Sequence, residues 1–137
     1  MTYLLDTNAC IGWLRQNRAD LVNRIAQEPP ANIVICSVVV GELLFGVERS
    51  AAAHRINSRH QVEQLRLRFV SVPFNDAAAE AYGRLRAYLA GMGTIIGAND
   101  LLIAAIALAN GLTLVTHNTA EFSRVPGLPL EDWENSP

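Results

Sequence analysis

Three carboxylates stand out from their apolar neighbours: Asp6, Glu42 and Asp100. Glu42 lies in an apolar run from Val38 to Val47, and Asp100 precedes nine consecutive apolar residues. A buried carboxylate without a partner is costly or takes up a proton, so each of these side chains needs one. Converging carboxylates with no lysine, and no histidine at ligand spacing, favour a hard cation such as Mg²⁺ or Mn²⁺. Such an ion acidifies water and neutralises a phosphoryl oxygen, so the first hypothesis is phosphodiester hydrolysis.

Each acid also has a simpler explanation. Asp6 and Asp100 both stand at predicted helix starts, where Asp is a favoured N-cap. Glu42 could lie on a solvated helix face, although we expect its helix to be buried nearly all round. Gly41 and Gly46 in the same helix are expected to allow close helix packing.

The elements that would position these acids are short strands alternating with helices. Apolar, β-branched runs predict four strands, at Tyr3–Asp6, Ile33–Cys36, Phe69–Val72 and Leu112–Thr116. Caps and breakers predict helices between them: Thr7–Arg15, Asp20–Glu28, a helix capped by Ser37 that runs to Val47, Ala51–Arg68, a helix capped by Asn75 that runs to Ala90, and Leu101–Ala109. A short turn at 119–122 and an edge strand near Leu130 complete the prediction.

This alternation indicates the fold class. Strands separated by helices form a parallel sheet covered on both faces, so we expect an α/β fold, a three-layer α/β/α sandwich with a short, mainly parallel sheet. In such sheets ligands bind beyond the carboxyl ends of the strands, which is where Asp6 and Glu42 would lie. Asn118, just past the fourth strand, would lie there too. Asp100 would have to reach this edge through the tertiary fold.

Composition sets the outer limits. The 137 residues fit one domain, 1–137, and half of them are hydrophobic. A net charge of −2 argues against a protein that coats nucleic acid, and all 11 basic residues are arginine, which excludes a catalytic lysine. Cys10 and Cys36 are expected to be reduced, buried thiols. No apolar run reaches the roughly 20 residues of a membrane span and no signal peptide is visible, so we expect a cytoplasmic protein with no membrane contact.

The ordered set of motifs resembles one family across essentially the whole chain. The motifs are Leu4–Asn8, Gly41–Leu43, Gly97–Ala105, Thr116–Asn118, Glu121–Phe122, Val125–Leu128 and Glu131–Trp133. In this order and at these separations they resemble the PIN-domain ribonucleases, specifically the VapC toxins of bacterial toxin–antitoxin pairs.

The resemblance implies roles for individual residues. Asp6 and Asp100 would be direct metal ligands, and Glu42 would complete the cluster directly or through water. Further polar residues would support the carboxylates, namely Asn8, Thr116, Asn118 and Glu121. Many PIN domains carry a fourth acid where this chain has Asn118, so Glu121, one turn later, is expected to contribute instead.

The resemblance also implies an activity and partners. The family cleaves structured RNA, often tRNA, by in-line attack of a metal-activated water, with Mg²⁺ as cofactor and Mn²⁺ able to substitute. A VapB-type antitoxin would silence the enzyme by placing its tail in the acidic groove. The toxin would form a homodimer and a larger toxin–antitoxin assembly, and would meet DNA only through the antitoxin.

An arginine stripe is a second candidate feature. Arg55, Arg59 and Arg66 fall on one side of the long predicted helix. A solvated face is the default interpretation, and a track for the RNA backbone is the alternative.

Two other functions remain open at this stage. An apolar strand that ends in Asp6-Thr7-Asn8 also resembles the start of a haloacid-dehalogenase-type phosphatase, with Asp6 as nucleophile. That chemistry normally needs a second acid at the position of Asn8 and a lysine, and this chain has neither. The other alternative is a non-catalytic interaction domain whose acids are only caps, which would show no carboxylate-dependent Mn²⁺ binding.

Overall fold

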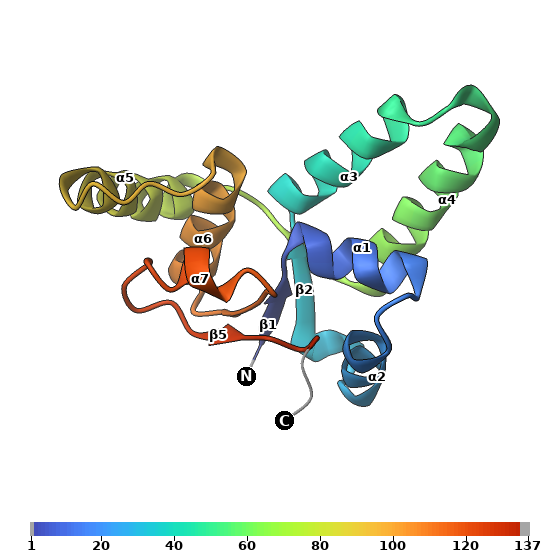
Figure 1. Ribbon diagram of the computed structural model, residues 1–137, viewed down its shortest axis with the longest axis horizontal. Helices are drawn as coiled ribbons and strands as arrows, with labels where there is room; N and C mark the ends of the chain where they lie inside the picture. Colours follow the sequence, from blue (N-terminus) through green and yellow to red (C-terminus); the bar gives the residue numbers. More distant parts are fainter. Residues whose placement is uncertain (1, 135–137) are drawn as a thin grey trace.

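The computed structural model describes residues 2–134 and is built around one parallel sheet (Figure 1). Its strands are β1 (Tyr3–Leu5), β2 (Ile33–Cys36), β3 (Val70–Val72), β4 (Thr113–Val115) and β5 (Leu130–Glu131). They lie in the order β3-β2-β1-β4-β5, and every neighbouring pair is parallel. The predicted α/β class is therefore confirmed. The sheet is parallel throughout, including the strand at Leu130.

The helices cover both faces of this sheet. They are α1 (Thr7–Arg15), α2 (Ala19–Gln27), α3 (Ser37–Arg49), α4 (Ala52–Arg68), α5 (Asp76–Gly91), α6 (Ala98–Asn110) and α7 (Thr119–Phe122), with a short 3-10 turn at Pro30–Asn32. The connections β1 to β2 to β3 run in one direction along the sheet, and β3 to β4 to β5 run back. Right-handed crossovers therefore place α1 to α4 on one face and α5 to α7 on the other, which gives the three-layer sandwich.

The central strands form the core because both of their faces are covered. All residues of β1, β2 and β4 are buried, and Leu4, Leu5 and Ile35 are fully so. Burying such a side chain contributes about 1.5–3 kcal/mol, so Leu5→Ala should destabilise the fold by roughly 2–5 kcal/mol. The edge strand β3 is different, since Val70 is 71% exposed.

The strand order reverses between β1 and β4, and this point positions the acids. Leu5 of β1 is in register with Val115 of β4, and the Asp6 backbone N–H donates to the Val115 carbonyl at 3.1 Å. In open parallel sheets the connections diverge at such a point and leave a crevice beyond the strand ends. Asp6 and Thr116, the residues that follow these two strands, therefore stand side by side at its base.

Two predicted caps are wrong, for local reasons. Helix α6 begins at Ala98 with Gly97 as N-cap, so Asp100 lies inside the first turn and does not cap it. Ser37 is the first residue of α3, and its hydroxyl accepts a hydrogen bond from the Phe74 backbone N–H at 3.1 Å. Asn75 does cap α5, accepting from Ala78 N–H.

Helix α3 is more open than its sequence implies. Its buried residues are Val39, Val40, Leu43 and Val47, whereas Phe45 is 62% exposed. A Cβ placed on either glycine of α3, Gly41 or Gly46, would meet nothing within 4 Å. The expectation that these glycines allow close packing is therefore wrong. Each costs the helix roughly 0.5–1 kcal/mol relative to alanine without a packing gain.

Helices α3 and α4 project from one side of the sheet and α5 with α6 from the other, which gives the molecule a V-shaped outline (Figure 1). The carboxyl end of β1 lies at the base of this V, next to the start of α1 (Figure 1), and β4 pairs with β1 in parallel. In residues 2–134 no helix is both long enough and apolar enough to cross a membrane.

Candidate active site

Asp6 combines a structural role with a chemical one. Its carboxylate caps α1 by accepting from the Ala9 backbone N–H at 2.8 Å, and it is hydrogen-bonded by the Thr116 side chain. The side chain is only 5% exposed, and this burial raises its pKa despite the two hydrogen bonds, which act in the opposite direction. The capping explanation is thus correct for Asp6, but it leaves a desolvated carboxylate that a cation would stabilise.

Glu42 faces the same crevice from the second turn of α3. Its Oε1 accepts a hydrogen bond of 2.6 Å from the Thr7 hydroxyl on α1, so the two helices are joined across the site. Glu42 is half-buried. Sequence reasoning did not single out Thr7, and the available signal was its position directly after Asp6.

Asp100 and Glu121 form a carboxyl pair on the opposite side of the crevice. Burial, followed by the charge of Glu121 and a hydrogen bond with it, raises the pKa of Asp100 to about 7. The pKa of Glu121 is lowered, chiefly because its Oε1 accepts from the Gly97 backbone N–H at 2.7 Å. The proton of the pair therefore resides on Asp100. The charges of Asp6 and Glu42 also raise the pKa of Asp100, which places these acids in one electrostatic site.

The predicted supporting residues differ in their contacts. Thr116 is buried and contacts both Asp6 and the Asn118 backbone N–H, which donates to its hydroxyl at 3.0 Å. The Asn118 amide donates to Glu121, so this asparagine orients an acid. The side chain of Asn8 is exposed, and its backbone carbonyl accepts a hydrogen bond from Arg18 at 3.1 Å.

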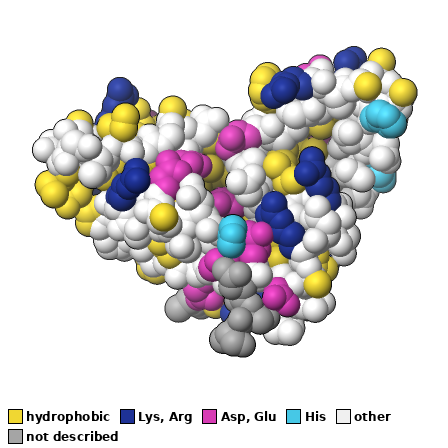
Figure 2. Space-filling view, in the orientation of Figure 1, with side chains coloured by type: hydrophobic (Ala, Val, Ile, Leu, Met, Phe, Trp, Pro, Cys, Tyr) yellow, Lys and Arg dark blue, Asp and Glu magenta, His cyan; other side chains and the backbone are white. Residues whose placement is uncertain are grey.

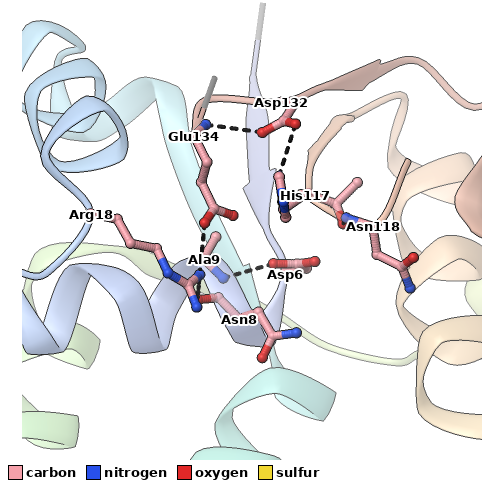
Figure 3. Close-up of polar contacts among 9 residues, drawn as sticks. Asp6, Asn8, Ala9, Arg18, His117, Asn118, Asp132 and Glu134 are labelled. Atoms are coloured by element: carbon pink, nitrogen blue, oxygen red, sulfur yellow. Dashed lines mark hydrogen bonds and ion pairs between the residues drawn. The ribbon is translucent and has the colours of Figure 1, made fainter. Parts of the chain in front are cut away.

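A second polar group lies beside Asp6 (Figure 3). His117 pairs with Asp132 at 3.0 Å, and Glu134 pairs with Arg18 at 3.0 Å. The charge of Glu134 raises the pKa of Asp6, and that of Arg18 lowers it. The sequence analysis placed His117 and Asp132 within motifs of the family without giving either a role, and it did not consider Glu134, because the proximity of these residues depends on the return of the chain along β5.

A divalent ion needs ligand atoms that lie close enough together to share it. In residues 2–134, three ligand atoms from different His, Cys, Asp or Glu side chains lie within 4.8 Å of one another only at His117, Asp132 and Glu134. Two of these side chains are paired with each other, and the third pairs with an arginine. The predicted carboxylates are more widely spaced. A Mg²⁺ ion takes one or two direct carboxylates and keeps several waters, so the wider cluster fits it.

The cluster has no ion-paired cation among the described residues, although the charge of Arg18 lowers the pKa of Asp6. Within the described part of the chain, no arginine or histidine forms an ion pair with Asp6, Glu42 or Asp100. Asp6 and Glu42 accept hydrogen bonds from backbone N–H and hydroxyl groups, and Asp100 donates its hydrogen bond to the carboxylate of Glu121. Negative charge is therefore concentrated where the strands end, and Figure 2 shows Asp and Glu side chains gathered in this notch.

The arginine stripe of α4 has partners of its own. Arg59 and Arg66 both pair with Glu63, at 3.3 and 3.4 Å. Arg55 donates to the carbonyls of Ser50 and Glu48 at the turn between α3 and α4. Whether the stripe also binds RNA stays a prediction.

A groove of about 600 Å³ opens beside the acids, between α1 and α3. Its lining consists of polar groups near the carboxylates and of one wall of α3: Thr7, Asn8, Ile11, Val38, Gly41, Glu42, Phe45, Gly46, Arg49 and Asn99. Because Glu42 is part of this lining, any ligand in the groove is continuous with the acidic site.

Comparison with known proteins points to one family. The family model described as the PIN domain matches residues 3–128. Ribonuclease VapC2 of Rickettsia felis is 38% identical over 98% of this chain and 99% of its own, and the tRNA(fMet)-specific endonuclease VapC of Salmonella typhimurium is 35% identical over 97% and 98%. The crystal structure of DNA-bound VapBC from Salmonella typhimurium contains a chain with a TM-score of 0.90 and 34% identity, over 97% of this chain and 98% of that one. A chain of VapBC2 from Rickettsia felis, bound to a DNA fragment from their promoter, has a TM-score of 0.89 and 36% identity, over 97% and 99%.

Proposed function

The chain belongs to the PIN-domain family, as a VapC-type ribonuclease toxin of a VapBC toxin–antitoxin system, and on this basis we propose a specific chemistry. It is an endoribonuclease that requires Mg²⁺, with Mn²⁺ able to substitute, and its site is built by Asp6, Glu42 and Asp100. Family membership also removes the haloacid-dehalogenase alternative.

The observation that carries the proposal is the unbalanced charge at the strand ends. Asp6 is buried and Asp100 has a pKa of about 7, so both carboxylates are destabilised in the metal-free protein. The hydrogen bonds from the protein do not offset the free energy needed to keep these carboxylates charged, whereas a divalent ion would offset it. When bound, such an ion supplies an acidified water and neutralises charge on the phosphoryl group.

The chain's own residues would hold the site in shape. Thr116 and the Ala9 N–H fix the orientation of Asp6, and Thr7 fixes that of Glu42. Glu121 accepts from Gly97 at the start of α6 and from Asn118, so it ties the first turn that carries Asp100 to α7. Such outer contacts set where a metal ligand points, which is why we assign Thr116, Asn118 and Glu121 a supporting role. Asn8 is assigned to the groove wall.

We propose structured RNA such as tRNA as the substrate class. The Salmonella relative is named a tRNA(fMet)-specific endonuclease, and it aligns with nearly the whole of this chain. Arg55, Arg59 and Arg66 are proposed to add a weak, general attraction for the RNA backbone. An enzyme with this substrate would act in the cytoplasm as one domain, residues 1–137.

The proposed partners follow from three of the solved relatives, which are VapBC complexes, two of these three with DNA. We propose that a VapB-type antitoxin covers the acidic cluster at the strand ends of this chain. DNA would be contacted only through that antitoxin. A homodimer and a larger toxin–antitoxin assembly are proposed as well.

Cleavage of total RNA by the protein, freed of any antitoxin, tests the proposal. Strand-resolved products should form in Mg²⁺ or Mn²⁺ and disappear in excess EDTA, and an Asp6→Asn preparation purified in parallel controls for contaminating nuclease. Cleavage that is specific to the wild type and undiminished in EDTA would remove the metal-dependent mechanism.

A further inference from the structure

The wall that α3 presents to the groove has an unusual composition. Gly41, Phe45 and Arg49 are spaced by four residues and form one stripe along the helix, and Gly46 lies one turn after Glu42 on the neighbouring stripe. All five residues line the same groove of about 600 Å³. The stripe thus starts beside the catalytic carboxylate and leads away from it.

The two glycines leave open space where a side chain would otherwise stand. A Cβ at Gly41 or Gly46 would meet no atom within 4 Å, so neither residue is required for contact with another part of the described chain. Both lie in a helix, where glycine is unfavourable. Glycine without a packing role is expected where a ligand approaches the backbone closely. The glycines are therefore an observation, separate from charge, that points to a ligand in this groove.

Phe45 and Arg49 add a flat apolar surface and a cation to this space. Phe45 is 62% exposed, and the guanidinium carbon of Arg49 lies 5.4 Å from the centre of its ring. Within residues 2–134, Arg49 forms no ion pair with a carboxylate. An exposed ring beside an uncompensated planar cation presents the two groups on which unpaired bases stack, and the cation can also bind a phosphate.

We propose that this groove is a nucleotide-binding subsite, in which the base of an unpaired RNA nucleotide stacks on Phe45, Arg49 binds its phosphate, and Gly41 with Gly46 make room for the sugar. The inference rests on the proposed ribonuclease function and extends it with a specificity-determining surface. An RNA segment fits the groove better than a peptide does on two counts. Glu42 makes the groove continuous with the site of phosphodiester cleavage, and the free charge of the groove is positive away from the acids.

Direct RNA binding tests the subsite without relying on cleavage. The probe is a fluorescein-labelled single-stranded oligoribonucleotide of about ten nucleotides, measured by anisotropy in millimolar Ca²⁺ to neutralise the acidic cluster. Phe45→Ala and Arg49→Gln should each weaken binding about tenfold, near the lower end of what one base–aromatic stack contributes. Phe45→Trp should restore binding, because the flat surface is kept.

Gly46 provides a test in which stability and binding move in opposite directions. Gly46→Ala and Gly46→Leu should raise the melting temperature, because both residues favour the helix and nothing lies within 4 Å of the new Cβ. RNA binding should nevertheless fall, more for the larger side chain. A variant that is more stable and yet binds less RNA cannot be explained by misfolding.

Matched controls lie on α5, on the other side of the sheet. Tyr88→Ala removes an exposed aromatic ring (47% exposed) and Arg84→Gln an exposed arginine, and both should bind the probe as the wild type does. Wild-type affinity in the Phe45, Arg49 and Gly46 variants, with a loss of antitoxin binding instead, would overturn the subsite and make the groove a protein-docking surface. A wild type that binds the probe with the expected variant pattern and does not cleave RNA in Mg²⁺ would refute the ribonuclease function and leave the subsite standing.

Discussion

The acidic cluster at the strand ends and the arginine stripe of α4 both concentrate charge of one sign, but they balance it differently. On α4, Arg59 and Arg66 both form ion pairs with Glu63, and Arg55 donates hydrogen bonds to backbone carbonyls. In the cluster, Asp6 and Asp100 are desolvated and lie among other carboxylates, with no ion pair to a cation in residues 2–134.

This difference shows that the acidic cluster, and not the stripe, needs a cation from outside the chain to balance its charge. Exposed ion pairs such as those on α4 contribute little to stability and are common on protein surfaces. Carboxylates that remain close together without a cation make the folded state less stable, and such strain persists where binding or chemistry benefits from it. Substitutions should therefore have large effects in the cluster and small effects on the stripe.

The largest effect is expected for loss of a cluster carboxylate. Asp6→Asn and Asp100→Asn should each lower the rate of RNA cleavage in Mg²⁺ by about 100-fold or more, because a lost ligand moves the ion and weakens its charge. Single-turnover cleavage of a defined RNA measures this. If both variants keep wild-type rates, the active site lies elsewhere in the chain.

The next effect is on the stability of the metal-free protein as pH changes. The pKa of Asp100 is raised from 3.8 to about 7, so the folded chain holds a proton that the unfolded chain releases. Stability should therefore fall as pH rises from about 4.5 to 7, and the full penalty should be present above pH 7. The lowered pKa of Glu121 acts in the opposite direction only below its ordinary value of 4.5.

Melting curves in EDTA at several pH values measure this slope, with Asp100→Asn as the comparison. The variant should melt higher than the wild type at pH 8, by about 4 °C for each ~1 kcal/mol of relieved repulsion, and should show a flatter slope. Mn²⁺ should stabilise the wild type by mass action and stabilise the variant much less. Equal shifts in both proteins would mean that Asp100 is not part of a metal site.

A smaller effect is expected at Asn118. Asn118→Asp replaces the amide that donates to Glu121 with a further carboxylate, so the metal-free variant should be less stable than the wild type. Its affinity for Mn²⁺ should rise several-fold, because a charged oxygen ligand is added near the cluster. Calorimetric titration gives the affinity, and an unchanged value would place Asn118 outside the reach of the metal.

The smallest effect is expected on the stripe. Replacing Arg55, Arg59 and Arg66 together by Gln should weaken RNA binding by roughly two- to threefold and flatten its dependence on salt, as fewer counterions are released. Binding isotherms at several salt concentrations measure the slope. A slope identical to that of the wild type would show that the stripe is only a solvated face, and a loss as large as that of Asp6→Asn would contradict the contrast between the two regions.

Much of the fold followed from local sequence. Helix α1, strand β2 and the short helix α7 begin and end at the predicted residues, because a strand of apolar residues, a capping Asp6 and breakers act over a few positions. The alternation of these elements was sufficient to predict the parallel sandwich. The order of the motifs was sufficient to indicate the family. The acids themselves were visible because each stands against an apolar background.

What the sequence left undecided depends on contacts between distant segments. The reversal of strand order places Asp6 beside Thr116. The Glu121 side chain of α7 reaches the start of α6, where it accepts from the Gly97 N–H, and its charge raises the pKa of Asp100. The exposed face of α3 was misjudged, because apolar composition reports what a helix could bury and not which neighbours arrive to cover it. Residue types and spacing thus determined which groups could do chemistry. Only the tertiary structure decided which of them share one crevice and which charges remain unbalanced there, since burial and electrostatic coupling arise from distances that the linear chain does not contain.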